Sequence, residues 1–217
     1  MKQFVVIGMG RFGSNLAKSL YRLGNQVLAI DYQKRNIEYI KDQVTEAIVA
    51  DAKDLKLLTQ VIDKDVDSVI IATGNDIEMS VLTTLHLRNI GVKHLVAKAK
   101  SEDHGEILKA LGVDEVIFPE KDIAKRLAEK LDMTNMIFNI PIAHDYSIIE
   151  VITPANFVGK SLIELDLRNK YGINIIGIRP LISDELKVVP NGQTIIPPDS
   201  AMILICKTDE ISKLRLQ

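Results

Sequence analysis

Three glycines and an aspartate near the N-terminus have the types and the spacing of a phosphate-binding turn. Gly8, Gly10 and Gly13 follow the apolar run Phe4–Ile7, and Asp31 ends the next apolar run. The first glycine permits a tight turn, the second leaves room for a pyrophosphate, and the third lets a helix lie close to the strand. A helix that starts there presents unpaired N–H groups to phosphates, and the carboxylate can accept hydrogen bonds from ribose hydroxyls. The pattern predicts a nucleotide site in the N-terminal half.

Arg11 and Phe12 fill the predicted first turn of this helix. A cation at a helix N-terminus opposes the helix dipole, at a cost of a few tenths of a kcal/mol up to about 1. An arginine fork beside the glycine turn offsets that cost if it engages a phosphate or a carboxylate bidentately. The alternative is a solvated arginine that points away from the turn.

The composition indicates a globular α/β protein and excludes several partners. The 217 residues are 47% hydrophobic, with 29 acidic and 27 basic side chains and no basic block, so we expect no nucleic acid partner. No apolar run reaches the roughly 20 residues that span a bilayer, and the chain enters a strand without a signal peptide, so we expect a cytoplasmic protein without direct membrane insertion. Cys206 stands alone in an apolar run and is expected to be a core residue.

The first part of the chain alternates between strand-like and helical patterns. Six strands are predicted, at Phe4–Ile7, Val27–Ile30, Ala47–Ala50, Ser68–Ala72, His94–Ala97 and Glu115–Phe118. The segments between them carry apolar residues at helical spacing. This alternation predicts a Rossmann-like, doubly wound parallel sheet.

Ligands of such sheets bind at the carboxyl ends of the strands, where the strand order reverses. This rule gathers the glycine turn and Asp31 with residues that follow three later strands. These residues are Asp51 and Ala52 after the third strand, Thr73 and Gly74 after the fourth, and Lys98 after the fifth.

The pattern changes after a helix predicted from about Asp122 to Leu131. The later strands are predicted at Ile137–Ile142, Ser147–Ile152, Ile173–Arg179, Lys187–Val189 and Ala201–Cys206. One helix is expected near Ser161–Lys170, closed by Gly172 in the left-handed C′ position. We therefore expect a nucleotide-binding domain with its linker helix over residues 1–134 and a small α+β domain, for ligand binding and dimerisation, over 135–217.

A nucleotide fold of this type raises the possibility of a dehydrogenase, which needs an acid–base group beside its cofactor. His86, His94, His104 and His144 are isolated in the sequence, and each is expected to be a packing or surface residue. The sequence therefore predicts no catalytic residues and no enzyme activity.

Five separate motifs together resemble one known family. They are the segments 8–13 (GMGRFG), 28–31 (LAID), 82–85 (LTTL), 118–122 (FPEKD) and 168–172 (RNKYG). Their combination resembles the RCK (KTN) regulatory subunits of Ktr/Trk-type potassium uptake systems, with the closest likeness to the KtrA/KtrC gating subunits. The resemblance extends over essentially the whole chain and includes the small C-terminal RCK_C (TrkA_C) domain.

In the N-terminal domain the resemblance implies specific roles for residues at the carboxyl ends of the predicted parallel strands. Gly8, Gly10, Arg11, Phe12 and Gly13 would hold the phosphates of ATP or ADP, with Arg11 near the γ-phosphate. Asp31 would bind the ribose, and Asp51 and Ala52 would flank the adenine, although Ala50 departs from the family's usual glycine or asparagine. Thr73, Gly74 and Lys98 would complete the site.

Glu120 matches a family glutamate that reaches toward the nucleotide or its cation, which makes it a candidate metal ligand. The alternative is an acid at the start of a helix, favoured by the helix dipole.

In the C-terminal domain the resemblance implies a cyclic di-AMP site. The matching positions are Leu162, Arg168, Asn174 and Pro190. An arginine can neutralise a cyclic phosphate, an amide can read a base edge, and leucine and proline can line the purine faces. The alternative is structural, with the arginine at a helix C-terminus and the other residues in core and turn.

The family resemblance implies a regulatory subunit that lies in the cytoplasm, peripheral to the membrane. It would form homodimers that assemble into an octameric ring beneath a membrane-embedded potassium channel subunit. Nucleotide binding would change the shape of the ring, and cyclic di-AMP would act as a further effector.

Two other functional classes remain open. One is a small NAD(H)-dependent oxidoreductase or redox sensor, because Asp31 also suits the ribose of NAD. The other is a purely structural oligomerisation subunit.

Overall fold

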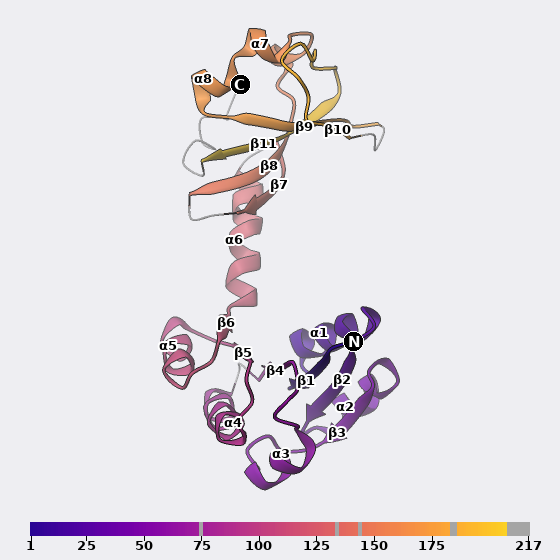
Figure 1. The fold of residues 1–217 in the computed structure, drawn as a ribbon, viewed down its shortest axis with the longest axis vertical. Coiled ribbons are helices and arrows are strands. Elements are labelled where there is room, and N and C mark those ends of the chain that lie inside the picture. The colour runs from indigo at the N-terminus through magenta and orange to yellow at the C-terminus, as the bar shows by residue number, and fades with distance from the viewer. Residues whose placement is uncertain (74–75, 133–134, 143–144, 183–185, 208–217) are drawn as a thin grey trace. The chain divides into compact units, whose positions relative to one another are not determined.

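The computed structural model describes residues 1–73, 76–132, 135–142, 145–182 and 186–207. The chain divides into two compact units, Met1–Glu120 and Lys121–Gln217 (Figure 1). The division falls within helix α6 (Pro119–Asp132), and the domain boundary expected after residue 134 stays a prediction.

The first unit is built on a six-stranded parallel sheet in the order β3-β2-β1-β4-β5-β6. The strands are β1 (Gln3–Ile7), β2 (Gln26–Asp31), β3 (Glu46–Val49), β4 (Ser68–Ile71), β5 (Leu95–Lys98) and β6 (Glu115–Ile117). The predicted Rossmann-like class is confirmed, and the strands differ from their predicted ranges only at the ends. The order reverses between β1 and β4, which is where this type of sheet binds ligands.

Helices cover both faces of this sheet. They are α1 (Arg11–Arg22), α2 (Lys34–Ile40), the 3₁₀ turn η1 (Lys41–Gln43), α3 (Leu55–Val61), α4 (Ile77–Ile90) and α5 (Glu102–Ala110). Because side chains of a strand alternate between faces, Val6 of β1 packs with Ala17 of α1 and Ile37 of α2. Val5 joins the other core, to which α3, α4 and α5 contribute buried side chains. Each face therefore has its own hydrophobic core.

The second unit contains a five-stranded sheet in the order β10-β9-β11-β8-β7. The strands are β7 (Met136–Pro141), β8 (Tyr146–Ile152), β9 (Asn174–Pro180), β10 (Lys187–Val188) and β11 (Ser200–Lys207), and neighbours run antiparallel. The helical segments η2 (Ala155–Phe157), α7 (Leu162–Leu165) and α8 (Leu167–Tyr171) pack on one face of the sheet. Cys206 lies fully buried in this core, as the sequence predicts.

Two predicted helices differ from the observed ones. The single helix expected over Ser161–Lys170 is two short helices, because Asp166 adopts a left-handed conformation at φ 48° and breaks the hydrogen-bond ladder. Helix α6 begins at Pro119 and not at Asp122, since proline suits the first helical position, where its missing N–H costs nothing. The predicted left-handed C-cap at Gly172 is confirmed at φ 66°.

Candidate functional site

The glycine turn between β1 and α1 lies at the carboxyl edge of the parallel sheet, next to the end of β4. Gly8 has φ +96°, and a Cβ atom there would stand 2.7 Å from Cγ2 of Thr73. A Cβ atom on Gly13 would stand 1.9 Å from the carbonyl oxygen of Gly8, so helix and turn meet without room for a side chain. A Cβ atom on Gly10 would meet nothing within 4 Å. The turn is thus closely packed against neighbouring atoms at Gly8 and Gly13 and open at Gly10.

The N-terminus of α1 lacks the side-chain cap that three neighbouring helices have. Asp54, Asp76 and Ser101 cap α3, α4 and α5 by accepting hydrogen bonds from backbone N–H groups. Gly10, the N-cap of α1, offers no side chain, and the first turn holds no acidic residue. The first N–H groups and the positive end of the dipole are therefore available to an anion from outside the chain.

Asp31 fixes the shape of the glycine turn from the end of β2. Its side chain is buried at 6% exposure, and its Oδ2 accepts a hydrogen bond from the Met9 N–H at 2.6 Å. Its Oδ1 accepts one from the Gln33 N–H at 2.7 Å. Each carboxylate oxygen has a second lone pair, so Asp31 keeps the capacity to accept a further hydrogen bond, such as one from a ribose hydroxyl. The tie between Met9 and Asp31 was missed by sequence reasoning, which assigned Asp31 only to the ribose.

Phe12, Lys98 and Glu120 come together from three elements. The Lys98 ammonium lies 6.0 Å from the centre of the Phe12 ring and donates to Glu120 Oε1 at 2.5 Å. The side chain of Lys98 is 11% exposed and that of Glu120 is 73% exposed. The hydrogen bond from Lys98 and one from the backbone hold the pKa of Glu120 below its ordinary value. The sequence assigned all three residues to one predicted site, but it gave no sign that Lys98 would pair with Glu120, because these residues lie on separate elements, β5 and α6.

Other predicted site residues lie in different surroundings. Asp51 is exposed and accepts a hydrogen bond from the Lys53 N–H at 2.9 Å, which forms a local turn. Ala52 is 1% exposed and packs in the core, and its carbonyl oxygen accepts from the Thr83 hydroxyl at 3.2 Å. The buried Thr73 Oγ1 has no partner in the described structure. Gly74 lies outside the described residues.

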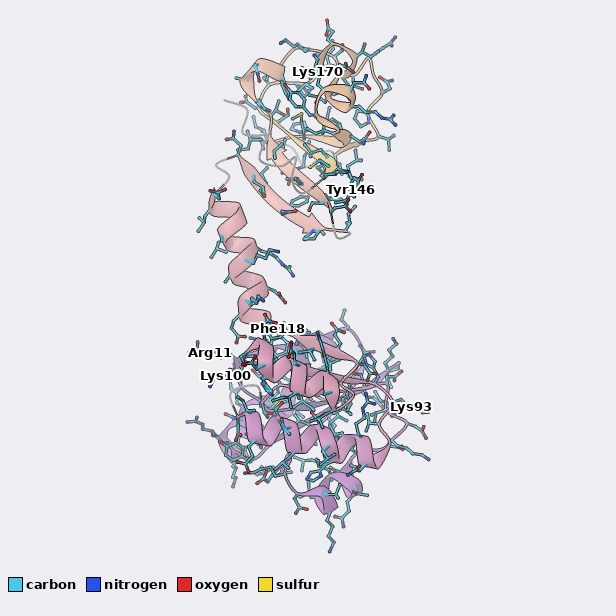
Figure 2. The ribbon with its side chains drawn as sticks, turned by 90° about the vertical axis from the view of Figure 1, so that its left-hand side faces the viewer. Arg11, Lys93, Lys100, Phe118, Tyr146 and Lys170 are labelled. Atoms are coloured by element: carbon cyan, nitrogen blue, oxygen red, sulfur yellow. The ribbon has the colours of Figure 1, made fainter. Side chains whose placement is uncertain are left out.

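Arg11 is exposed at the start of α1 (Figure 2). The structure therefore brings the glycine turn, Arg11, Phe12, Asp31, Thr73, Lys98 and Glu120 to one edge of the sheet, and it places Ala52 with its methyl group in the core.

The four positions expected to bind a cyclic dinucleotide lie on neighbouring segments of the second unit. Leu162 begins α7 and its N–H donates to the Thr194 carbonyl at 3.1 Å, which ties α7 to the chain that follows Pro190. The Val189 N–H donates to the Ile176 carbonyl at 2.9 Å, so Pro190 lies near the start of β9, where Asn174 is exposed. Arg168 is exposed on α8.

The described histidines make structural contacts. His86 Nε2 lies 3.1 Å from the Lys53 carbonyl, and His94 Nδ1 lies 2.9 Å from the Ser68 hydroxyl. His104 is 1% exposed, its Nδ1 accepts from the Lys100 N–H at 3.2 Å, and burial lowers its pKa. His144 lies outside the described residues.

The described part of the chain contains no group of three or more histidine, cysteine, aspartate or glutamate side chains arranged to hold a metal ion. Glu120, the candidate metal ligand, pairs with Lys98. No helix within the described residues is both long enough and apolar enough to cross a bilayer.

Comparison with known proteins identifies both units. Residues 4–119 match the TrkA-N domain and residues 146–217 match the TrkA-C domain. The chain is 32% identical to the Ktr system potassium uptake proteins C and A of Bacillus subtilis, in each case over 98% of this chain and 95% of the relative.

Solved structures share the fold. The GsuK RCK domain aligns with a TM-score of 0.65 at 19% identity, over 98% of this chain and 46% of that one. The NAD(P)-binding domain of an exopolyphosphatase-related protein from Archaeoglobus fulgidus aligns with a TM-score of 0.54 at 25% identity, over 61% of this chain and 98% of that one. With both family domains present and the similarity extending nearly end to end, the chain belongs to the TrkA (RCK) family of Ktr potassium uptake regulatory proteins, and not to a family of enzymes.

Proposed function

We propose that this protein binds an adenine nucleotide, ATP or ADP, at the carboxyl edge of its parallel sheet and thereby gates a membrane-embedded potassium transporter. The observation that carries the proposal is the uncapped N-terminus of α1 behind an open Gly10. An anion is the ligand that such a terminus favours, because the free N–H groups and the dipole both attract negative charge. The hydroxyl of Thr73 at the same edge has no hydrogen-bond partner among the residues that the structure describes, which supports a polar ligand.

The cations around the turn fit a ligand with more than one phosphate. Arg11 extends from the first turn of α1, and Lys98 lies by Phe12 at the end of β5. A dinucleotide held by backbone alone does not require either cation, whereas a terminal phosphate gains a bidentate partner in Arg11. Glu120, already paired with Lys98, would then border the terminal phosphate or a cation bound to it.

Gating requires that the nucleotide favour one arrangement of subunits over another. We propose that homodimers assemble into an octameric ring at the cytoplasmic face of the transporter, and that ATP and ADP draw Arg11 and the neighbouring subunit together to different extents. A coupling free energy of about 1–3 kcal/mol between the two arrangements is sufficient for clear regulation. The 32% identity to Ktr system potassium uptake proteins supports a transporter of that class as the partner.

Cyclic di-AMP is proposed as a second ligand, at Leu162, Arg168, Asn174 and Pro190. Support comes from the hydrogen bonds that bring α7, the start of β9 and the chain after Pro190 together. The exposed Arg168 and Asn174 offer a phosphate partner and a base partner.

NAD(H) is a second candidate for the first unit. The 25% identity to a domain described as NAD(P)-binding favours it, and the buried carboxylate of Asp31 suits an unphosphorylated ribose.

Calorimetric titration of the purified full chain with ATP, ADP, NAD, NADH and cyclic di-AMP tests these proposals, with light scattering to follow the size of the oligomer. We expect Arg11→Ala to reduce the ratio of ATP to ADP affinity and to leave the unfolding midpoint unchanged. Arg22→Ala is the matched control, because Arg22 lies in the last turn of the same helix. The proposal fails if Arg11→Ala keeps the wild-type affinity ratio, or if no adenine nucleotide binds.

A further inference from the structure

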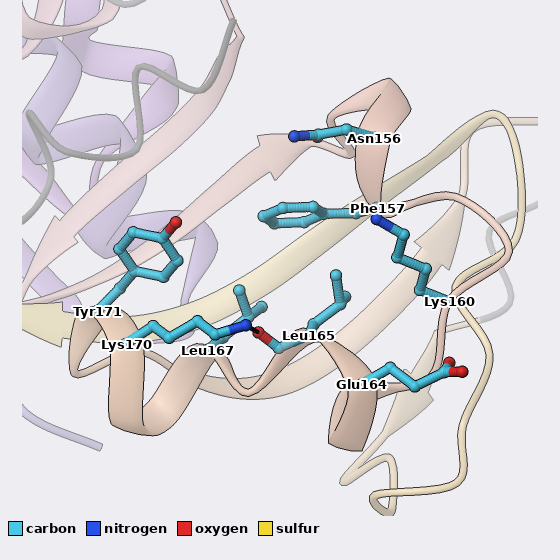
Figure 3. Close-up of a pocket in the computed structure, with 8 residues that line it drawn as sticks. All are labelled: Asn156, Phe157, Lys160, Glu164, Leu165, Leu167, Lys170 and Tyr171. Atoms are coloured by element: carbon cyan, nitrogen blue, oxygen red, sulfur yellow. Dashed lines mark hydrogen bonds between the residues drawn. The ribbon is translucent and has the colours of Figure 1, made fainter.

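The second unit contains a hollow of about 300 Å³ that has no part in the proposals above (Figure 3). Its floor is apolar and consists of Phe157 from η2, Leu165 from α7 and Leu167 from α8, all at most 6% exposed. Asn156, Lys160 and Tyr171 stand at its rim. It shares no lining residue with the four positions proposed for cyclic di-AMP.

The floor exists because the chain breaks at Asp166. In a continuous helix, residues two apart point to different sides, so Leu165 and Leu167 could not line the same hollow. The left-handed Asp166, at φ 48°, ends α7 and begins α8, and both leucines then join one core. A non-glycine residue in this conformation is uncommon, and here it separates two helices around an open space.

Backbone hydrogen bonds hold the rim in place. The Gly159 N–H donates to the Ile196 carbonyl at 2.9 Å, and the Ile196 N–H donates to the Lys160 carbonyl at 3.0 Å. On the opposite side, the Lys170 ammonium donates to the Leu165 carbonyl at 3.2 Å. The hollow is therefore preformed, so a ligand would lose little free energy in ordering it.

The charge of the rim favours an anion. Lys160, Lys170 and Glu164 all line the hollow, so its charged side chains carry one net positive charge. The Glu164 carboxylate Oε2 accepts from the Ser161 N–H at 2.7 Å and from the Ser161 hydroxyl at 2.8 Å, and the Lys170 ammonium donates to the Leu165 carbonyl. The ammonium of Lys160 has no such partner among the described residues. A ligand that enters would meet a positive charge at the rim and an aromatic ring at the floor.

We propose that this hollow binds a small organic anion with a planar, apolar body, of the size of an aromatic monocarboxylate. The body lies against Phe157 and the two leucines, the anionic group pairs with Lys160, and the Asn156 amide and Tyr171 hydroxyl supply further hydrogen bonds. The Phe157 ring extends from η2 toward Tyr171 on α8, so the two aromatic side chains bound the space for a planar ring (Figure 3).

Benzoate is the probe, titrated into the isotope-labelled full chain and followed by NMR chemical shifts. We expect saturable binding at millimolar concentration or below, with shifts centred on η2, α7 and α8. Benzyl alcohol, which has the ring without the charge, and acetate, which has the charge without the ring, should each bind at least about fivefold more weakly. Equal binding of benzoate and benzyl alcohol would overturn the role of Lys160.

Two variants localise the site. Lys160→Gln should weaken benzoate binding about fivefold, while Lys207→Gln, an exposed lysine at the end of β11, should leave it unchanged. Asn156→Trp changes an exposed residue and should fill the hollow and abolish binding without lowering the unfolding midpoint. Wild-type affinity in both Lys160→Gln and Asn156→Trp, or no saturable binding to the wild type, would refute the proposal. Neither result depends on whether the first unit binds a nucleotide.

Discussion

Met9 and Asp31 are joined by a hydrogen bond of 2.6 Å from a backbone N–H to a buried carboxylate. The bond links the glycine turn after β1 to the end of β2, two segments that are 22 residues apart. Through it the acid that suits a ribose also sets the geometry of the turn that suits phosphates. Loss of the carboxylate would therefore affect the fold as well as the ligand.

Asp31→Asn should lower the free energy of unfolding by about 2 kcal/mol, because hydrogen bonds to a charged acceptor are worth roughly 1.5–3 kcal/mol. The amide retains only one acceptor oxygen for the two N–H groups of Met9 and Gln33. Denaturant unfolding measures the change. Asp51→Asn is the control, since that exposed carboxylate accepts one local hydrogen bond and its loss should cost less than about 1 kcal/mol. Equal losses in the two variants would contradict the structural role of Asp31.

Gly10→Ala and Gly13→Ala form a matched pair that separates ligand binding from folding. The free energy of unfolding of the Gly13 variant should be lower by about 3 kcal/mol or more, because its methyl group would stand 1.9 Å from the Gly8 carbonyl oxygen. The free energy of unfolding of the Gly10 variant should lie within about 1 kcal/mol of the wild-type value, since nothing lies within 4 Å of its methyl group. It should nevertheless bind adenine nucleotide at least tenfold more weakly, if the phosphates occupy that space. Thermal unfolding and calorimetry check both expectations, and wild-type nucleotide affinity in Gly10→Ala would count against the site.

The ion pair of Lys98 and Glu120 should make a small, acid-sensitive contribution to stability. The pKa of Glu120 is lowered in the fold, so the contribution is complete above the ordinary glutamate value of about 4.3 and is lost as the pH falls through the lowered pKa. Because Glu120 is 73% exposed, Glu120→Gln should cost less than about 1 kcal/mol at pH 7. Chemical unfolding at pH 7 and at acid pH should show this difference shrinking in acid.

Glu115→Gln, an exposed glutamate on β6, serves as the comparison for Glu120→Gln. A Glu120→Gln effect that is unchanged in acid would argue against the ion pair as its source.

His104 should make the protein less stable below neutral pH. Burial lowers its pKa, so between that value and the ordinary value of about 6.5 the unfolded chain binds a proton that the folded chain does not. The free energy of unfolding should therefore fall as the pH is lowered through 6.5, and the slope should level off below the lowered pKa. Denaturant unfolding at a series of pH values from 7.5 to 4.5 measures this change in the free energy of unfolding.

His104→Gln should remove this slope, whereas His94→Gln, at an exposed histidine, should keep it. A slope that persists in His104→Gln would assign the pH dependence to other groups.

Much of the fold could be predicted from local sequence patterns. The alternation of strands and helices predicted the parallel sheet, and the glycine spacing placed a tight turn at Gly8, where φ is +96°. Gly172 ends α8 in the expected left-handed conformation. These features could be predicted because each depends on a residue's own backbone preferences or on the periodicity of a short segment.

The features that sequence reasoning missed depend on contacts between distant segments. The left-handed conformation of Asp166 is uncommon for a non-glycine residue. It is accompanied by a hydrogen bond from the Asn169 amide to Asp166 Oδ1 and by the packing of Leu165 and Leu167 into one core. Sequence reasoning also gave no sign that Ala52, whose place beside the adenine stays a prediction, would have its methyl group in the core and its carbonyl oxygen bonded to the Thr83 hydroxyl of α4.

The sequence by itself determined the parallel nucleotide-type sheet, its glycine turn and the family to which the chain belongs, because these follow from short-range spacing and motif. The tertiary structure alone decided that Met9 is tied to Asp31, that Lys98 pairs with Glu120, and that a hollow opens beside Phe157. Those outcomes depend on where separate elements end in space, which no single segment encodes. Long-range packing and electrostatics select them only after the sheets and helices have come together.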